Sequence, residues 1–567
     1  MAKIHTLKIK NFRGFESFEH VFGFSNFICL IGRGDSGKTT ILEAISRVLS
    51  PSWNLSFYDT DFYNCDISNP IEIEVTLYEV PKRLLLEDTF GTYKRFLDPQ
   101  SGIIQDNAKD DSLSALTIRL IVEKDLEPRW EVVNARQTPV KIGSGDRARL
   151  NVFLIADSID RHFSWNKGTP LFSLLKQEDT ENPNVNVILD SLRDAKSKID
   201  ENEFEHLSIV LDRVKNSASA LGLDISAANT TIDSKDISIM DGRISLHEEK
   251  IPLRLKGKSS KRLVSIAIQT ELAKDGGIIL IDEIEQGLEQ DRSRHLAKTL
   301  KNNNSSQIFV TTHSQSVLVE LTSSDLFLLK EPSEKLIVFP SSLQGCLRGN
   351  PEAFFSKRIL VCEGPTELGV IRALNDFRIK NGKENMALKG VSAINGKGSE
   401  LVAYCKAFAS IGYEVRLFCD SDDEGVNTQK KSMRTAGIRI FDWEDQYCLE
   451  EAIFSNIEVS LVEKALKLYA KIKLEDDNSK TLDAVKKSIK ASISSKIADV
   501  NWPLTSDTCD LQTKKEIGKI AKNKSWFKSE TKGQEFGDLV FQNYTSLKPC
   551  NPIKLNFDGI SDWIDNG

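Results

Sequence analysis

The sequence predicts an α/β fold made of two α/β domains in series, with a helical insert in the first. Three observations predict this fold. Strand and helix patterns alternate in two separate stretches, and a segment rich in Gly, Pro and Ser at 340–356 lies between them. The third is length, because 567 residues exceed what one hydrophobic core usually holds. We therefore expect two or more domains.

Composition indicates an ordinary globular protein, with 40% hydrophobic and 28% charged residues. No apolar run approaches the roughly 18–20 residues that span a bilayer, and Met1–Phe12 has no signal-peptide core. The nine cysteines form no C-x-x-C pair, so neither disulfides nor a zinc site are indicated. We expect a cytoplasmic protein with no membrane partner.

The net charge of −7 excludes nucleic-acid binding through the field of the whole molecule, so any such binding needs a local basic patch. One candidate patch holds seven lysines and two aromatic residues, Trp526 and Phe527. The lysines are Lys514, Lys515, Lys519, Lys522, Lys524, Lys528 and Lys532. The alternative interpretation is a solvated helix face.

The first series begins with predicted strands at 4–10 and 26–31 and a helix at 38–49. Further strands are predicted at 71–79, 116–123, 130–133 and 152–156. Polar amphipathic stretches at roughly 185–220 predict an inserted helical hairpin. Alternation then resumes with helix 260–274, strand 277–282, helix 289–302, strand 307–311 and helix 314–321.

A phosphate-binding loop is predicted between the second strand and the first helix. Gly32-Arg33-Gly34-Asp35-Ser36-Gly37-Lys38-Thr39 fits G-x-x-x-x-G-K-[ST] completely. Gly32, Gly34 and Gly37 let backbone N–H groups surround a phosphate, Lys38 would reach the β- and γ-oxygens, and Thr39 would bind Mg²⁺. Thr40 is placed in the same site. The glycines also fit a dinucleotide-binding pattern, but no acidic residue stands at the spacing that this pattern requires.

The strand at 277–282 ends in two carboxylates, Asp282 and Glu283, which are costly to bury without a function. Asp282 would hold Mg²⁺ through water, and Glu283 would polarise the attacking water. The next strand delivers His313, which matches the histidine that senses the γ-phosphate in ABC-type ATPases. An isolated histidine would more often be structural. Its place one strand after the carboxylates favours the nucleotide site.

Gly257 to Arg262 precede a helix about 20 residues before Asp282, where ABC-type ATPases carry their signature sequence. The usual pair of adjacent glycines is absent, which predicts slow ATP hydrolysis but not loss of binding. With one phosphate loop and one signature per chain, complete sites would require a dimer or a higher homo-oligomer.

The second series comprises strand 358–363, helix 366–380, strand 390–394, helix 399–411 and strand 414–420. Glu363 ends its first strand, Glu367 begins the following helix, and Asp420 and Asp422 end its last strand. Carboxyl ends of parallel strands are where open α/β sheets place their sites. No histidine occurs beyond His313, and carboxylates alone select Mg²⁺ or Mn²⁺. Two such ions can stabilise both oxygens of a phosphodiester displacement. The alternative is a surface turn and a helix cap.

The pattern E-G-x-x-E followed by D-x-D resembles a Toprim domain. Combined with an ABC-type ATPase and the early N-F-R-G-F at Asn11–Phe15, it resembles the OLD family of ATP-dependent nucleases, whose Gabija members act in anti-phage defence. The resemblance covers essentially the whole chain. It implies an ATPase domain at 1–164 and 226–345, a helical dimerisation insert at 165–225, and a Toprim domain with a helical C-terminal extension at 346–567.

The resemblance also assigns site residues. Glu363 and Glu367 match the first acidic pair of the family, and Asp420 and Asp422 match the second. Leu449-Glu450 matches a later Leu-Glu pattern, which makes Glu450 a further metal ligand. Cys448 stands where the family often has an aspartate, and Glu451 and Asp445 are the two candidates to compensate for it. Lys532 best matches a late lysine that stabilises the transition state, with Lys528 as the second choice.

The resemblance implies an ATP-binding, metal-dependent endonuclease that cuts or nicks duplex DNA as an anti-phage effector, with one Mg²⁺ beside ATP and two Mg²⁺ or Mn²⁺ ions in the Toprim site. An accessory defence protein encoded nearby is a further expected partner. The alternatives are a non-cleaving repair ATPase similar to SMC or RecF proteins, and a primase or topoisomerase. A true SMC protein needs a long coiled coil, which the sequence lacks.

Overall fold

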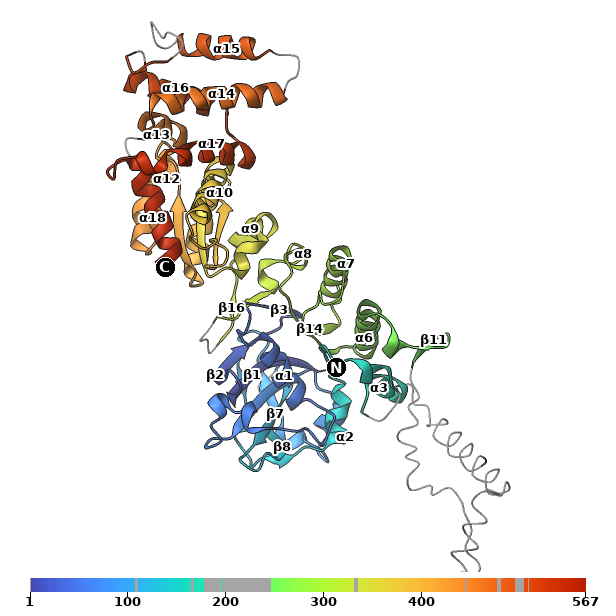
Figure 1. The fold of residues 1–567 in the computed structure, drawn as a ribbon. Coiled ribbons are helices and arrows are strands. Elements are labelled where there is room, and N and C mark those ends of the chain that lie inside the picture. Colours follow the sequence, from blue (N-terminus) through green and yellow to red (C-terminus); the bar gives the residue numbers. More distant parts are fainter. Residues whose placement is uncertain are drawn as a thin grey trace, which may run out of the picture. The chain divides into compact units, whose positions relative to one another are not determined.

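The computed structural model describes residues 2–107, 111–164, 168–177, 194, 246–330, 335–443, 446–476, 481–494, 504–507 and 509–566. The chain forms two compact units (Figure 1). The first comprises Met1–Ile28, Thr39–Glu289 and Thr299–Thr311, and the second comprises Cys29–Lys38, Gln290–Lys298 and Thr312–Gly567. Most of the helical insert predicted at 165–225 lies outside the described residues.

The first unit contains an antiparallel sheet built on strands with alternating apolar residues. In β4 the side chains of Ile71, Ile73 and Val75 are fully buried, whereas Glu72 and Glu74 lie on the other face. The sheet order is β2-β1-β4-β7-β5-β6, and β8 pairs with β7 and β9. Its strands are β1 (Lys3–Phe12), β2 (Phe15–Val21), β4 (Ile71–Tyr78), β5 (Arg95–Leu97), β6 (Ile104–Gln105), β7 (Leu113–Val122), β8 (Pro128–Val133) and β9 (Val140–Lys141).

Parallel strands carry the nucleotide-site motifs of the first unit. β13 (Gly277–Ile281) pairs in parallel with β10 (Leu154–Ile155) and β14 (Ser306–Thr311). All five residues of β13 are buried, as expected for a continuous apolar run covered on both faces. Helices α1 (Lys38–Val48) and α6 (Lys258–Leu272) and the shorter α2 (Ser144–Arg147) and α3 (Pro170–Gln177) complete this part. A short hairpin, β11 (His247–Glu248) and β12 (Ile251–Pro252), precedes α6.

In the second unit, β15 (Leu326–Leu328) pairs in parallel with β3 (Phe27–Ile31) and antiparallel with β16 (Ile337–Val338). Helices α7 (Gln290–Lys301) and α8 (Gln315–Leu318) flank β14 in the sequence. The segment rich in Gly, Pro and Ser at 340–356 forms α9 (Gln344–Gly349) and a 3-10 helix at Pro351–Phe355. It is therefore ordered and largely helical.

A parallel four-stranded sheet with order β18-β17-β19-β20 follows. The strands are β17 (Arg358–Cys362), β18 (Val391–Asn395), β19 (Glu414–Phe418) and β20 (Arg439–Phe441), and the helices between them are α10 (Pro365–Lys380), α11 (Leu401–Ser410) and α12 (Glu424–Thr435). Cys362 lies opposite Phe418 in the central strand pair. The residues that follow these two positions therefore emerge together at the carboxyl edge of the sheet.

The C-terminal extension is helical, as Figure 1 shows at its orange and red end. It comprises α13 (Leu449–Asn456), α14 (Val459–Asp476), α15 (Leu482–Ser494), α16 (Leu511–Asn523), α17 (Glu530–Gln542) and α18 (Pro552–Asn566). Gly518 brings α16 close to α13, because a Cβ at this position would lie 2.8 Å from the Glu451 backbone nitrogen. No helix of the described residues is long and apolar enough to cross a membrane.

Candidate active site

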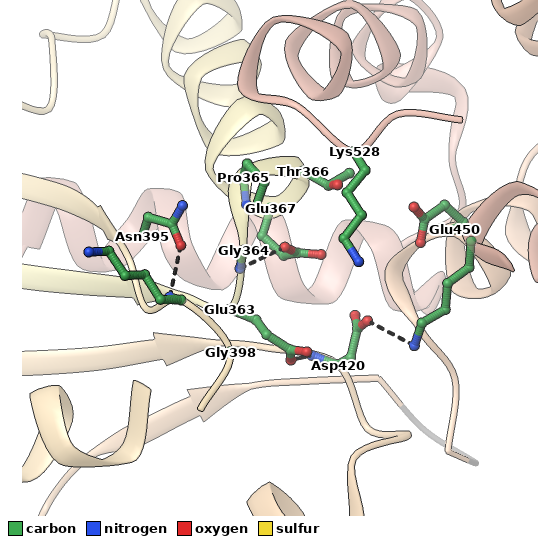
Figure 2. Close-up of a pocket in the computed structure, with 12 residues that line it drawn as sticks. Glu363, Gly364, Pro365, Thr366, Glu367, Asn395, Gly398, Asp420, Glu450 and Lys528 are labelled. Carbon is green, nitrogen blue, oxygen red and sulfur yellow. Dashed lines mark hydrogen bonds and ion pairs between the residues drawn. The ribbon is translucent and has the colours of Figure 1, made fainter. Parts of the chain in front are cut away.

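Four carboxylates meet in one cavity of about 350 Å³ at the carboxyl edge of the parallel sheet (Figure 2). Glu363 follows β17, Glu367 lies in the first turn of α10, Asp420 follows β19, and Glu450 lies in the first turn of α13. The cavity is lined by Glu363, Gly364, Pro365, Thr366, Glu367, Asn395, Lys397, Gly398, Asp420, Glu450, Lys522 and Lys528. The fold thus brings together carboxylates that lie up to 87 residues apart in the sequence.

Backbone N–H groups orient three of these carboxylates. Glu363 Oε2 accepts a hydrogen bond of 2.8 Å from the backbone N–H of Asp420. Asp420 Oδ1 accepts one of 2.8 Å from Leu449 N–H, and Glu367 Oε2 accepts one of 2.9 Å from Gly364 N–H. These bonds tie the ends of β17 and β19 to the starts of α10 and α13.

Burial raises the pKa values of all four carboxylates, and the charge of neighbouring carboxylates raises those of Glu363, Glu367 and Asp420 further. Burial is the largest cause in each case. Burial together with the neighbouring Glu450 raises the pKa of Glu367 to about 8. The pKa of Asp420 lies well above its ordinary value through burial and through Glu367 and Glu363. Such a cluster is costly in isolation, and a bound divalent cation would relieve it.

Lys522 of α16 lines the same cavity as the carboxylates. Its Nζ bonds to the Asp422 carboxylate and lies 3.8 Å from Asp420 Oδ2. Burial alone would lower the pKa of Lys522, but its bond to Asp422 and the charge of Asp420 raise it overall. Lys528 also lines the cavity, and Figure 2 shows its side chain reaching toward the carboxylates.

Lys532, the first choice for the late lysine, does not line this cavity. It lies in the first turn of α17, where its backbone N–H donates to Ser529 Oγ at 3.2 Å. The geometry instead places Lys528, the second choice, and Lys522 at the carboxylates. The sequence placed Lys522 in the basic run but not at the carboxylates, although Lys515, Lys519 and Lys522 share the i, i+4, i+7 spacing of one helix face.

The same helix face explains the basic run. Lys515 Nζ lies 4.8 Å from the centre of the Tyr447 ring, and Lys519 Nζ lies 3.9 Å from Glu451 Oε1. The two aromatic residues of the run are buried. Trp526 stacks on Tyr469 with ring centres 4.3 Å apart, and Phe527 stacks on Phe536 at 4.2 Å. Of the lysines of α16, Lys522 lines the cavity, whereas the aromatic rings belong to the core.

The residues around Glu450 clarify the Cys448 position. Cys448 is buried and caps α13, because its Sγ accepts from Glu451 N–H at 3.4 Å. The Glu451 carboxylate in turn accepts from Cys448 N–H at 3.3 Å and does not line the cavity. Burial raises the pKa of the Cys448 thiol. Asp445, the other candidate for compensation, lies outside the described residues.

The donor set fits a hard divalent cation, since four carboxylates and no histidine line the cavity. In the described part of the chain, no group of three His, Cys, Asp or Glu side chains is arranged to hold a metal ion as it stands. The chemistry of the donors therefore fits, while their side chains would have to turn to converge on an ion. Asp422 would also have to exchange its bond to Lys522.

The phosphate loop lies in the second unit, directly after β3. The Lys38 ammonium is buried in it and donates to Gly32 O at 3.1 Å, Arg33 O at 2.6 Å and Ser36 Oγ at 3.3 Å. Gly37 has a φ of 95°, which favours glycine, whereas Gly34 faces open space. The loop is therefore curled around the Lys38 ammonium.

In the first unit, Thr39 bonds to the predicted Mg²⁺ aspartate. Its Oγ1 lies 3.0 Å from each oxygen of the Asp282 carboxylate, and Thr311 Oγ1 donates to Asp282 Oδ1 at 2.6 Å. Thr40 follows in the first turn of α1 and is half-buried. The structure thus joins two residues 243 positions apart that the sequence assigned to one metal ion.

Glu283 and Arg262 lie beside this aspartate. Glu283 is exposed and has a φ of 47°, an uncommon conformation for a residue with a side chain. Arg262, from the altered signature segment, is buried and donates to the carbonyls of Asp282 and Glu283 and to Gln286 Oε1. The signature helix therefore fixes the end of β13 within the same chain.

His313 follows β14 and is exposed. Its ring centre lies 6.2 Å from that of Phe355, with an angle of 32° between the rings. The predicted γ-phosphate sensor therefore contacts the last residue of the 3-10 helix that precedes β17.

Two family models match the chain. Residues 27–320, just over half of it, match the model described as "AAA domain, putative AbiEii toxin, Type IV TA system". Residues 354–422 match "Overcoming lysogenization defect protein-like, TOPRIM domain", a stretch that contains Glu363, Glu367, Asp420 and Asp422. No curated protein matches the chain. The predicted α/β architecture of an ABC-type P-loop ATPase followed by a Toprim domain is confirmed.

Several solved structures are similar to part of the chain. An Smc head domain of Pyrococcus furiosus with an extended coiled coil, bound to the C-terminal domain of ScpA, is 14% identical, with 61% of this chain and 98% of that chain covered and a TM-score of 0.33. The recombination mediator protein RecF with ATPrS is 13% identical, with 60% of this chain and 98% of that chain covered and a TM-score of 0.33. An SMC head domain from Thermotoga maritima is 15% identical, with 60% of this chain and 98% of that chain covered and a TM-score of 0.26. Likeness at this level defines no activity.

Proposed function

This chain belongs to the AAA-domain family and joins that domain to an OLD-like Toprim domain, and from this premise we propose that it is a metal-dependent DNA endonuclease regulated by ATP. The observation that supports the proposal best is the cavity at the carboxyl edge of the parallel sheet. It combines four carboxylates with Lys522 and Lys528. Hydrolysis of a phosphodiester needs both kinds of group, since the attacking water must be activated and the charge on the phosphate must be neutralised.

Each residue of the cavity has a proposed role. Glu363, Glu367, Asp420 and Glu450 would hold one or two Mg²⁺ or Mn²⁺ ions, with Asp422 as a further ligand once Lys522 releases it. When bound, such ions activate water and stabilise the leaving oxygen. Lys522 and Lys528 would then face the phosphate and neutralise the charge that develops on it. The family resemblance assigned this role to Lys532.

The lysine face of α16 supports duplex DNA as the substrate. Lys515, Lys519 and Lys522 share one side of the helix and Lys522 lines the cavity, so a DNA backbone on this face would lead to the carboxylates. The chain as a whole carries a charge of −7, so this local patch would provide the contacts to phosphate. Binding should weaken steeply as salt increases.

Nucleotide binding is proposed to control the nuclease rather than to drive it, because phosphodiester hydrolysis is already favourable. Lys38 and Thr39 would bind the phosphates and Mg²⁺ of ATP, Glu283 would orient the water, and His313 would sense the γ-phosphate. The altered signature favours slow hydrolysis. Completing each site from two chains supports a homo-oligomer, and the OLD-like Toprim domain supports a role in anti-phage defence with a partner encoded nearby.

A plasmid-nicking assay tests the proposal. Supercoiled plasmid is incubated with the full chain in Mg²⁺, Mn²⁺ or EDTA, with and without ATP. We expect nicked or linear products with either ion and none in EDTA. Binding of plasmid without any cleavage would contradict the proposal and favour a non-cleaving ATPase that resembles SMC or RecF proteins.

A further inference from the structure

A short segment links the surroundings of His313 to the carboxylate cavity. This bridge segment, Gln344–Phe355, comprises α9 and the 3-10 helix that follows it. Cys346, Leu347, Ala353 and Phe354 within it are fully buried. A displacement at one end of such a closely packed segment would move the other end with it.

The segment contacts residues that follow α8 at its start and His313 at its end. At its start, the Gln344 side chain accepts from Ser323 N–H at 2.8 Å and donates to Leu321 O at 3.3 Å. Both partners follow α8, which begins two residues after His313. At its end, the Phe355 ring contacts the His313 ring with centres 6.2 Å apart.

The middle of the segment holds a loop of the carboxylate cavity. Asn350 has 5% of its surface exposed. Its Oδ1 accepts from Asn395 N–H at 3.2 Å, and its Nδ2 donates to Asn395 O at 3.5 Å. One buried amide therefore pairs with both polar groups of the Asn395 backbone, at the end of β18.

The loop that begins at Asn395 reaches Glu363 directly. Asn395, Lys397 and Gly398 line the cavity. Asn395 Oδ1 accepts from Lys397 N–H at 2.8 Å, and Gly398 N–H donates to Glu363 O at 2.9 Å. A displacement of Asn350 would therefore move the backbone that carries the central carboxylate.

We propose that the bridge segment carries the state of the nucleotide site to the carboxylate cavity, with Asn350 as the positioning residue at its centre. The proposal rests on the proposed nuclease function and specifies how that nuclease is regulated. His313 and Phe355 respond to the nucleotide site, and Asn350 passes the displacement to the Asn395–Gly398 loop. The Glu363 backbone is the part of the site that responds.

The test compares nicking rates at saturating Mn²⁺ with and without a non-hydrolysable ATP analogue. The readout is the nicking rate with the analogue divided by the rate without it. Coupling of ordinary strength would change this ratio by about 5- to 150-fold in either direction. The variants are Phe355→Ala, Phe355→Tyr and Asn350→Ala. Lys38→Ala serves as the reference without nucleotide response. Arg348→Ala changes an exposed side chain of α9 and serves as the matched control. Affinity for the analogue is measured for each variant.

We expect Phe355→Ala to bind the analogue and to nick at the basal rate of the wild type, but with a ratio near one. Phe355→Tyr and Arg348→Ala should keep the wild-type ratio. Asn350→Ala should also have a ratio near one, with a slower basal rate because the loop loses its support. If Asn350→Ala does not fold, the two Phe355 variants decide.

A wild-type ratio in Phe355→Ala, at unchanged affinity for the analogue, would overturn the proposal. So would a ratio of one in the wild type, and in both cases the nuclease function would stand. A wild-type protein that does not cleave at all would instead contradict the proposed function. The two failures are therefore distinguishable.

Discussion

At the scale of the residue, the carboxylates that form the cavity are also its main source of instability. Glu367 is buried beside Glu450 and Glu363, and burial is the largest reason why its pKa rises to about 8. The usual pKa of a glutamate in an unfolded chain is about 4.3. Glu367 thus favours the folded state only while it is protonated. Its contribution to the free energy of unfolding is lost as the pH rises from its pKa in the unfolded chain to its pKa in the folded chain.

The first prediction concerns this pH dependence. In EDTA, the free energy of unfolding should fall as the pH rises from 6 to 8, by at most about 1.4 kcal/mol per pH unit from this group. Glu367→Gln cannot ionise and should flatten the dependence. Urea unfolding at several pH values measures it. A steeper fall in Glu367→Gln than in the wild type would contradict the assigned cause.

The lysine at the site gives the second prediction. Lys522→Ala should slow cleavage about 100-fold, the usual cost of removing one group that stabilises developing charge. Lys532→Ala should slow it less, because Lys532 does not line the cavity. Lys524→Ala is the matched control, since its Nζ bonds to Ser492 Oγ. A larger loss in Lys532→Ala than in Lys522→Ala would restore the assignment made from sequence.

These residues also show what sequence can and cannot predict. Glu363 and Asp420 were predicted because each directly follows an apolar strand, and parallel strands end at one edge of a sheet. Lys522 was not predicted, because it reaches Asp422 across 100 residues through the packing of α16 on α13. A contact of that kind has no local pattern in the sequence.

At the scale of the element, the position of α16 depends on Gly518. This glycine lies against the backbone of Glu450 and Glu451 in α13, and a side chain there would meet backbone rather than a flexible group. The close contact sets the distance between the lysine face of α16 and the carboxylates. A small residue at this position is therefore a requirement of the site as well as of the fold.

The third prediction follows from this contact. Gly518→Ala should lower the free energy of unfolding by about 1–3 kcal/mol, as overpacking usually does, and should also slow cleavage. Gly145→Ala is the control, because a Cβ there meets nothing within 4 Å. Chemical unfolding and nicking rates measure both effects. Unchanged stability and activity in Gly518→Ala would show that α16 is not held at this distance.

Most long elements with a strong pattern were predicted, but the seven-residue strand β2 and the twelve-residue helix α12 were not. β13 was found because it is a continuous apolar run, and β4 because it alternates. The short strands β5, β6 and β16 were missed, since two or three residues carry no period. The break at 340–356 was predicted from glycine and proline, but the order that Asn350 and Phe354 give it was not.

At the scale of the whole molecule, the chain joins an ATPase domain to a Toprim domain, and their candidate sites are complete to different degrees. The ATPase module has its phosphate loop, and Thr39 Oγ1 lies 3.0 Å from the Asp282 carboxylate. Its signature residue Arg262, however, is buried against the end of β13 of its own chain. The Toprim module has its carboxylates and lysines in one cavity. This difference between the two sites favours an ATPase domain that controls a nuclease by binding nucleotide over one that hydrolyses ATP rapidly.

The central claim is that the carboxylate cavity is the nuclease centre, and the nicking rate of Glu363→Ala tests it most directly. The variant should lose detectable cleavage in Mg²⁺ and Mn²⁺ while its affinity for ATP stays that of the wild type. Glu424→Ala, which changes an exposed glutamate outside the cavity, should nick at the wild-type rate. Cleavage by Glu363→Ala at the wild-type rate would contradict the claim.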